Sequence, residues 1–260
     1  MTVWVFGASY AKNYGFKDQW MAKVAQGLDT KLFCYALDGC SLDYTYQKFN
    51  SVRDQIKEND VVIVALTTQV KRWFFKHKPE QNIVIQYDEN TTPTNFKFTT
   101  VTKNPKEGEA LAAYYESLNN TEAYENYTIN FFYNLEYITK KLNLHTIVLT
   151  SYYDTEIWLE DKKDLFPSLN FSIDKLLDVS LLEYTKRYFV DMPQGITDVR
   201  VNHLTKSNHE ILANKILDNI KNKIPIDLTK GFIKHILDME TMKDPNFVHK
   251  ELFGGIAFKK

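Results

Sequence analysis

The chain has few of the residues that mark stapled, collagen-like or membrane-spanning proteins. Its 260 residues include only 2 cysteines, 9 glycines and 7 prolines. Two cysteines give no disulfide framework, and no segment offers the roughly 18 consecutive apolar residues that a spanning helix requires. With 44% hydrophobic residues, the chain can instead bury one sizeable core without help from metals or disulfides.

The chain also lacks a dominant charge. Lys and Arg total 32 against 33 Asp and Glu, so the net charge is −1 and no global field favours nucleic acid or an anionic membrane. No basic segment followed by an apolar stretch opens the sequence, so we expect a soluble protein of the cytoplasm or of a host-cell cytosol. Cys34 and Cys40 suit a reduced compartment, and a disulfide between them stays open.

Several motifs of cofactor chemistry are missing as well. The sequence contains no Gly-rich phosphate loop, no Walker lysine, no Rossmann glycine triplet and no His/Cys cluster at metal-ligand spacing. We therefore expect no cofactor and no metal.

The first quarter of the chain alternates strand-like and helix-like segments. Apolar runs predict strands over 2–7, 31–36 and 60–66, with helices over about 17–28 and 43–57 between them. The run Val61–Leu66 is apolar on both faces, which is typical of a central parallel strand covered by helices. These segments predict a doubly wound α/β sheet.

The rest of the chain is less regular. Three prolines and two strand-like pieces, 82–87 and 96–101, predict an inserted hairpin or lid over about 77–108. Aromatic residues at helical spacing predict two core helices over 109–142, broken near residue 119; stacking on sugars is the alternative. A strand over 145–150, an irregular segment over 151–190 and a helix over about 207–222 follow. We expect one domain over 1–222, with a tail over 223–260 packed on it.

Two side chains occupy positions suited to a nucleophile and its base. Ser9 follows the first strand, Gly7 and Ala8, at the strand end where open α/β sheets hold ligands, and His203 precedes the last helix. His209 lies at the start of that helix, where packing or capping explains it. The other four histidines have no motif context and are expected to be structural or on the surface: His77, His145, His235 and His249.

These stretches resemble the SGNH (GDSL-type) hydrolase superfamily, whose blocks read Gly-Asp-Ser after the first strand and Asp-x-x-His near the end. Here they read Gly7-Ala8-Ser9 and Arg200-Val201-Asn202-His203. The second block centres on a glycine, matched by Gly39, and the third carries an asparagine, where this chain has Thr67 and Thr68. The resemblance implies a three-layer α/β/α sandwich with a mainly parallel, SGNH/flavodoxin-like sheet.

The resemblance also implies roles. The backbone N–H groups of Ser9 and Gly39, with the hydroxyl of Thr67 or Thr68, would bind the oxyanion. Asp198 is the first candidate for the acid that orients His203, with Asp191, Asp154 or a backbone carbonyl as alternatives. From its place soon after the third strand, and not from the resemblance, Arg72 is expected to be a surface arginine or to bind an anionic substrate group.

The resulting hypothesis is a metal-free serine esterase that removes O-acyl groups, with acetyl on a carbohydrate as the leading substrate. Its partner would be a small-molecule or glycan ester, and neither nucleic acid nor a membrane. The alternative is a noncatalytic protein of the same fold that binds glycan or serves in an assembly. A bias toward Lys, Asn, Ile and Tyr is typical of AT-rich bacterial and phage genomes.

Overall fold

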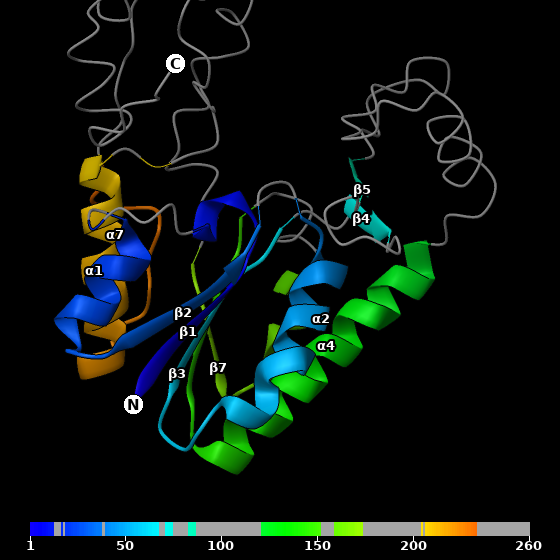
Figure 1. Ribbon diagram of the computed structural model, residues 1–260, viewed down its shortest axis with the longest axis horizontal. Coiled ribbons are helices and arrows are strands. Elements are labelled where there is room, and N and C mark those ends of the chain that lie inside the picture. The colour runs from blue at the N-terminus through cyan, green and yellow to red at the C-terminus, as the bar shows by residue number, and fades with distance from the viewer. Residues whose placement is uncertain are drawn as a thin grey trace, which may run out of the picture.

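The computed structural model describes the greater part of one α/β domain (Figure 1). The residues that it describes are 1–12, 17, 19–37, 40–67, 71–74, 83–86, 121–151, 159–173, 204 and 206–232.

The centre of the domain is a five-stranded sheet in which every pairing is parallel. Its order is β2-β1-β3-β6-β7. The strands are β1 (Thr2–Gly7), β2 (Lys31–Ala36), β3 (Val61–Ala65), β6 (His145–Leu149) and β7 (Leu169–Phe171).

Helices cover both faces of this sheet. Figure 1 shows α1 (Trp20–Gly27) and α7 (Lys206–Asn222) on one face, and α2 (Leu42–Val52) and α4 (Thr121–Leu142) on the other. This arrangement confirms the predicted three-layer sandwich. The strand order is that of the flavodoxin-like class of doubly wound sheets.

The alternation of side chains along the strands divides the core into two layers. On β1, Val3 and Val5 join the apolar cluster beneath α1 and α7, whereas Trp4 and Phe6 join the cluster beneath α2 and α4. All four side chains are at most 3% exposed. A strand that is apolar at every position is therefore buried on both faces, as expected for a parallel sheet.

A single carboxylate fastens the amino-terminal end of the sheet. Asp60 is 2% exposed and accepts hydrogen bonds from Thr2 N at 2.7 Å, from Trp4 Nε1 at 2.9 Å and from Lys57 N at 3.0 Å. Its own carbonyl accepts from His145 N at 3.0 Å. Because a buried carboxylate needs several donors, Asp60 fixes the starts of β1, β3 and β6 relative to one another.

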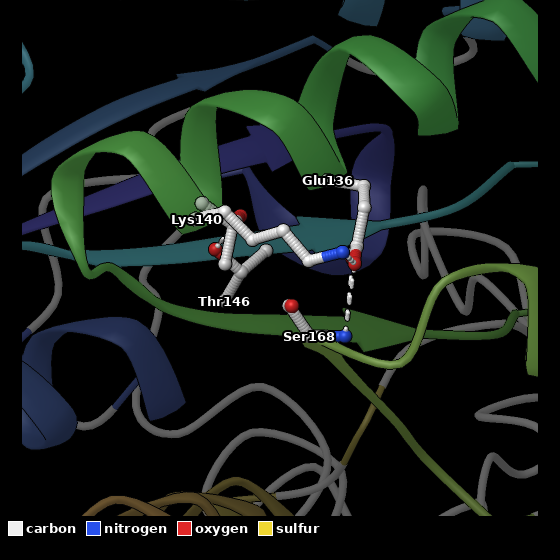
Figure 2. Close-up of polar contacts among 5 residues, drawn as sticks. Glu136, Lys140, Thr146 and Ser168 are labelled. Carbon is white, nitrogen blue, oxygen red and sulfur yellow. Dashed lines mark hydrogen bonds and ion pairs between the residues drawn. The ribbon is translucent and has the colours of Figure 1, made fainter.

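A second carboxylate ties α4 to the segment before β7 (Figure 2). Glu136, which is 6% exposed, accepts from Ser168 N with both oxygens, at 3.2 and 3.1 Å, and pairs with Lys140 Nζ at 2.9 Å. One turn further along, Thr139 Oγ1 lies 2.7 Å from Thr146 Oγ1 of β6. These contacts set the position of α4 along the sheet.

Two of the sequence predictions need correction. Ile83–Gln86 forms β5, but its antiparallel partner is β4 (Lys71–Phe74), which precedes the segment in which the insert was predicted. The predicted strand over 96–101 lies outside the described residues.

The segment 151–190, predicted to be irregular, contains β7 and a short 3₁₀ helix, η5 (Lys163–Leu165). A strand of three residues is too short to show a period in sequence.

The remaining predicted elements lie close to their expected places. The helix predicted from about residue 17 begins at Trp20, and the one predicted to reach 57 ends at Val52, followed by the 3₁₀ helix η2 (Arg53–Gln55). Thr121–Leu142 is one continuous helix, and the segment before it lies outside the described residues. Within the described part of the chain, every helix is too short or too polar to cross a membrane.

His145 joins β6 to the end of α7, as a structural residue. Its Nε2 lies 2.8 Å from Asn219 Oδ1, and the Asn219 amide nitrogen donates to Ile224 O at 2.8 Å. Lys223 Nζ, which can only donate, lies 3.0 Å from Nδ1. These contacts suit the neutral ring with its hydrogen on Nε2. Burial, and then the Lys223 ammonium, lower the pKa of His145, although the Asn219 hydrogen bond opposes them.

This environment predicts a pH dependence of stability. Because the pKa of His145 is lower in the folded chain than its ordinary value of 6.5, the unfolded chain binds more protons between the two values. Stability should therefore fall as the pH drops below 6.5 and stay level, for this group, above it. Urea denaturation at several pH values measures this. His145→Gln should flatten the curve in that window, and an unchanged slope would contradict the assignment.

Candidate active site

The predicted nucleophile follows the strand at which the sheet changes direction. The chain leaves β1 to form β2 on one side and then returns to form β3 on the other, so β1 and β3 border the switch point. Doubly wound sheets bind ligands outside the carboxyl ends of the strands at this point. Ser9 is the first residue of the 3₁₀ helix η1 (Ser9–Ala11), two residues beyond the end of β1. The backbone of Ser9 therefore lies at the carboxyl end of the first strand, as the sequence predicted.

Gly7 allows β1 to end against β3. Its φ is +147°, and a Cβ atom built on it would lie 2.4 Å from Ala65 O. Gly7 and Ala65 are paired in the parallel register, so the approach is one of backbone to backbone. Only glycine fits here without moving a strand.

Donors from three directions hold the segment Gly7–Lys12, which we call the serine turn. Four of its carbonyl groups accept bonds from outside the segment. The bonds are Leu37 N to Gly7 O at 3.2 Å, Cys40 Sγ to Gly7 O at 3.1 Å, Trp20 Nε1 to Tyr10 O at 2.8 Å, Cys34 Sγ to Ala11 O at 3.0 Å, and Gln19 Nε2 to Lys12 O at 3.0 Å. Within the turn, Ala11 N donates to Ala8 O at 3.0 Å.

These donors belong to elements that the core already fixes. Trp20 is fully buried at the start of α1, Cys34 lies on β2, and Cys40 is fully buried just before α2. The turn thus takes its position from two helices and a neighbouring strand. Backbone groups held in this way do not need to reorganise when charge develops beside them.

The loop that would carry the second block begins and ends on the serine turn. Gly39 lies outside the described residues, but Leu37 and Cys40 on either side of it both donate to Gly7 O. Directly after Cys40, Ser41 caps α2 by accepting from Tyr44 N at 3.4 Å. The role of the Gly39 N–H stays a prediction.

Thr67 and Thr68 occupy the position predicted for the third block, where the chain has no asparagine. Thr67 lies two residues beyond β3 and is 2% exposed, and Leu66 N donates to Leu149 O of β6 at 2.8 Å. Because Ala65 pairs with Gly7, Thr67 follows β3 at the level at which Ser9 follows β1. Thr68 lies outside the described residues. The oxyanion role of either threonine stays a prediction.

The predicted base and acid both lie outside the described residues, as do Asp191 and Asp154, the alternatives to Asp198. Beside His203, however, Leu204 is 3% exposed and belongs to the same apolar cluster as Tyr10 and Ala11 of the serine turn. Leu204 therefore packs on the face of the sheet where the serine turn packs. Figure 1 also shows the first turn of α7 at the end of the molecule where η1 lies.

His209 has the structural role predicted for it. Trp20 N donates to His209 Nδ1 at 3.4 Å, which satisfies the first amide of α1 from α7.

Arg72 lies on β4, opposite Ile85, and β4 contacts α2. Its predicted contact with an anionic group stays a prediction.

Sequence reasoning missed further hydroxyl groups at this edge. Thr150 and Ser151 follow β6 and are 4% and 1% exposed. Thr150 N donates to Ser172 Oγ, beyond β7, at 3.1 Å, and the two hydroxyl oxygens lie 3.3 Å apart. The rule that selected Ser9 also applies to Thr150. Ser172 had no such signal, because β7 itself was not predicted.

A tyrosine beside the two thiols stays protonated. Burial, and then the neighbouring Cys40 and Cys34, raise the pKa of Tyr44 to about 12. On the adjacent surface of α4, burial and the nearby Asp43 raise the pKa of Tyr127 as well. Near neutral pH, both side chains are therefore hydroxyl groups and not phenolates.

Among the described residues, no three His, Cys, Asp or Glu side chains gather as a metal site requires.

No protein-family model matches the chain, and no curated protein matches its sequence. Two solved structures, both described as belonging to the lipolytic G-D-S-L family, are similar to it at 10% identity and a TM-score of 0.40. The protein from Desulfitobacterium hafniense is matched over 82% of this chain and 95% of its own, and the protein from Veillonella parvula over 84% and 97%. The strand order and the parallel pairings of the sheet define the fold.

The contact between Gly7 and Ala65 predicts that Gly7→Ala is destabilising. The added methyl group would overlap Ala65 O, and the positive φ adds strain, so we expect a loss of at least about 2 kcal/mol. Urea denaturation measures the loss.

Gly231→Ala is the matched control. Gly231 also has a positive φ, +82°, but the nearest atom to an added Cβ is 3.8 Å away, on a lysine side chain. It should lose clearly less stability than Gly7→Ala. Equal losses would mean that φ alone, and not the approach to β3, makes Gly7 necessary.

Proposed function

We propose that the protein is a metal-free serine esterase that removes O-acyl groups. Ser9 is the nucleophile in this proposal, and His203 is the general base. The observation that supports the proposal is the serine turn, whose backbone follows β1 at the switch point of the sheet and is held by hydrogen bonds on both sides of Ser9.

The proposed reaction begins with attack of the Ser9 hydroxyl on the acyl carbon. His203 removes the hydroxyl proton and later returns it to the departing alcohol, after which water releases the acyl group from Ser9. Asp198 or a backbone carbonyl orients the imidazole. The burial of Leu204 in the apolar cluster that also includes Tyr10 and Ala11 supports the meeting of base and nucleophile.

Backbone amides would bind the negative charge that forms on the acyl oxygen. In this proposal, the N–H groups of Ser9 and Gly39 supply two donors, and the hydroxyl of Thr67 or Thr68 supplies a third. Each such donor is worth about 10²–10³ in rate. The fixed flanks of the Gly39 loop, both bound to Gly7 O, support the second of these roles.

The proposed substrate is an O-acetylated carbohydrate. The chain is rich in aromatic side chains of the kind that stack on sugars, with 16 Tyr and 4 Trp, and this richness supports the choice. Arg72 would bind an anionic group of the substrate.

A second candidate function is glycan binding, or a part in an assembly, without catalysis. The observation that favours it is the replacement of two family acids, by Ala8 and Arg200. Ala8 is 3% exposed, so the site of the first acid is filled by a small apolar group.

Labelling with a fluorophosphonate probe separates the two candidates. The esterase should label at Ser9 and hydrolyse a short-chain aryl ester, and Ser9→Ala should abolish both reactions. His203→Ala should lower turnover by about 10³ or more, because the members of a catalytic unit act together and the loss of one costs nearly as much as the loss of all. Chelators should change nothing.

Ser51→Ala is the control for these variants. Ser51 is exposed on α2, where its hydroxyl bonds Lys48 O at 2.8 Å, so its loss should affect neither reaction. A well-folded wild type that neither labels nor hydrolyses short esters would reject the esterase and leave the second candidate.

A further inference from the structure

Both cysteines of the chain contact the serine turn. The sequence has 2 cysteines in 260 residues, and their thiols donate to the carbonyls of Gly7 and Ala11. These carbonyls lie two residues before and two residues after Ser9. The two thiols thus bracket the predicted nucleophile.

The two contacts differ in burial but not in length. Cys40 Sγ lies 3.1 Å from Gly7 O and is fully buried, whereas Cys34 Sγ lies 3.0 Å from Ala11 O on a half-buried side chain. Cys34 belongs to β2 and pairs with Val5 of β1, so the sheet sets the distance that its thiol must bridge. Cys40 directly precedes the capped end of α2.

We propose that Cys34 and Cys40 are positioning residues for the Ser9 nucleophile. The proposal rests on the esterase function proposed above. A thiol is a weak donor, so neither bond contributes much to the free energy of unfolding of the whole domain. Their effect is local, because they hold the carbonyls of Gly7 and Ala11, on either side of Ser9, in the short turn that carries the reacting group. A displacement of about 1 Å at such a group costs roughly 10²-fold in rate.

Paired substitutions test this role. Cys34→Ala and Cys40→Ala remove a donor, whereas Cys34→Ser and Cys40→Ser keep a hydroxyl donor at the same position. Each alanine variant should lower kcat and the rate of Ser9 labelling by about tenfold or more, with KM within about twofold of wild type. Each serine variant should recover most of the loss.

Thermal unfolding shows which variants fold. If serine at the fully buried position 40 prevents folding, the Cys34 pair decides, because that side chain is only half-buried. Alanine and serine variants that lose the same activity would indicate packing and overturn the proposal. So would alanine variants that keep the wild-type kcat.

Alkylation provides an independent test, since the chain has no other thiols. The Cys34 thiol adds across the double bond of N-ethylmaleimide; a sulfur–carbon bond forms and the thiol proton passes to the adjacent carbon. Mass spectrometry measures the adduct. Loss of Ser9 labelling should follow modification of Cys34, and Cys34→Ser should remain active and insensitive. Complete alkylation of Cys34 with unchanged labelling would overturn the proposal.

Hydrogen exchange tests the role of the thiols without requiring esterase activity. If wild type does not label at all, hydrogen exchange in a peptide that covers residues 7–12 becomes the deciding measurement. The alanine variants should exchange faster there than wild type and the serine variants, while a peptide from α4 is unchanged. Equal exchange in all variants would show that the thiols do not hold the turn.

Discussion

The close approach of Gly7 to Ala65 is the constraint on which the candidate site depends. It allows β1 to end in contact with β3, with no side chain between the two strands. Because the chain then turns directly into η1, the strand end fixes where Ser9 stands relative to Thr67. The carbonyl of the same glycine accepts from Leu37 N and Cys40 Sγ, which brings the loop after β2 to the same point. Three strands are thereby coupled at one residue.

The two ends of the sheet are fastened by different chemistry. At the amino-terminal end, the buried carboxylate of Asp60 accepts from three nitrogen donors. At the carboxyl end, thiols, an indole and amide groups satisfy the carbonyls of the serine turn. The first arrangement suits permanent fixation, because a buried charge is costly to leave unpaired. In the second, the described donors to the carbonyls of the turn are neutral groups.

Much of the fold could be predicted from sequence because the central strands are apolar on both faces. The apolar runs predicted the boundaries of β1, β2 and β3 to within one residue, and the boundaries of α7 were predicted equally closely. Prediction failed where an element is defined by its partner. β7 has three residues, and β4 is recognised only by its pairing with β5. At the site, a strand-end rule identified Ser9, but the donors Trp20, Cys34 and Cys40 are tertiary contacts that leave no periodic signal.

The neutral fastening of the serine turn bears on the chemistry proposed for it. A tetrahedral oxyanion beside Ser9 would be destabilised by a nearby carboxylate, since like charges in a water-poor site repel strongly. Among the described residues, the groups that bond the carbonyls of the turn carry no negative charge. Ala8 extends this pattern: it is 3% exposed, so an acid there would be a buried charge one residue from Ser9. The buried side chain next to Ser9 is therefore small and uncharged.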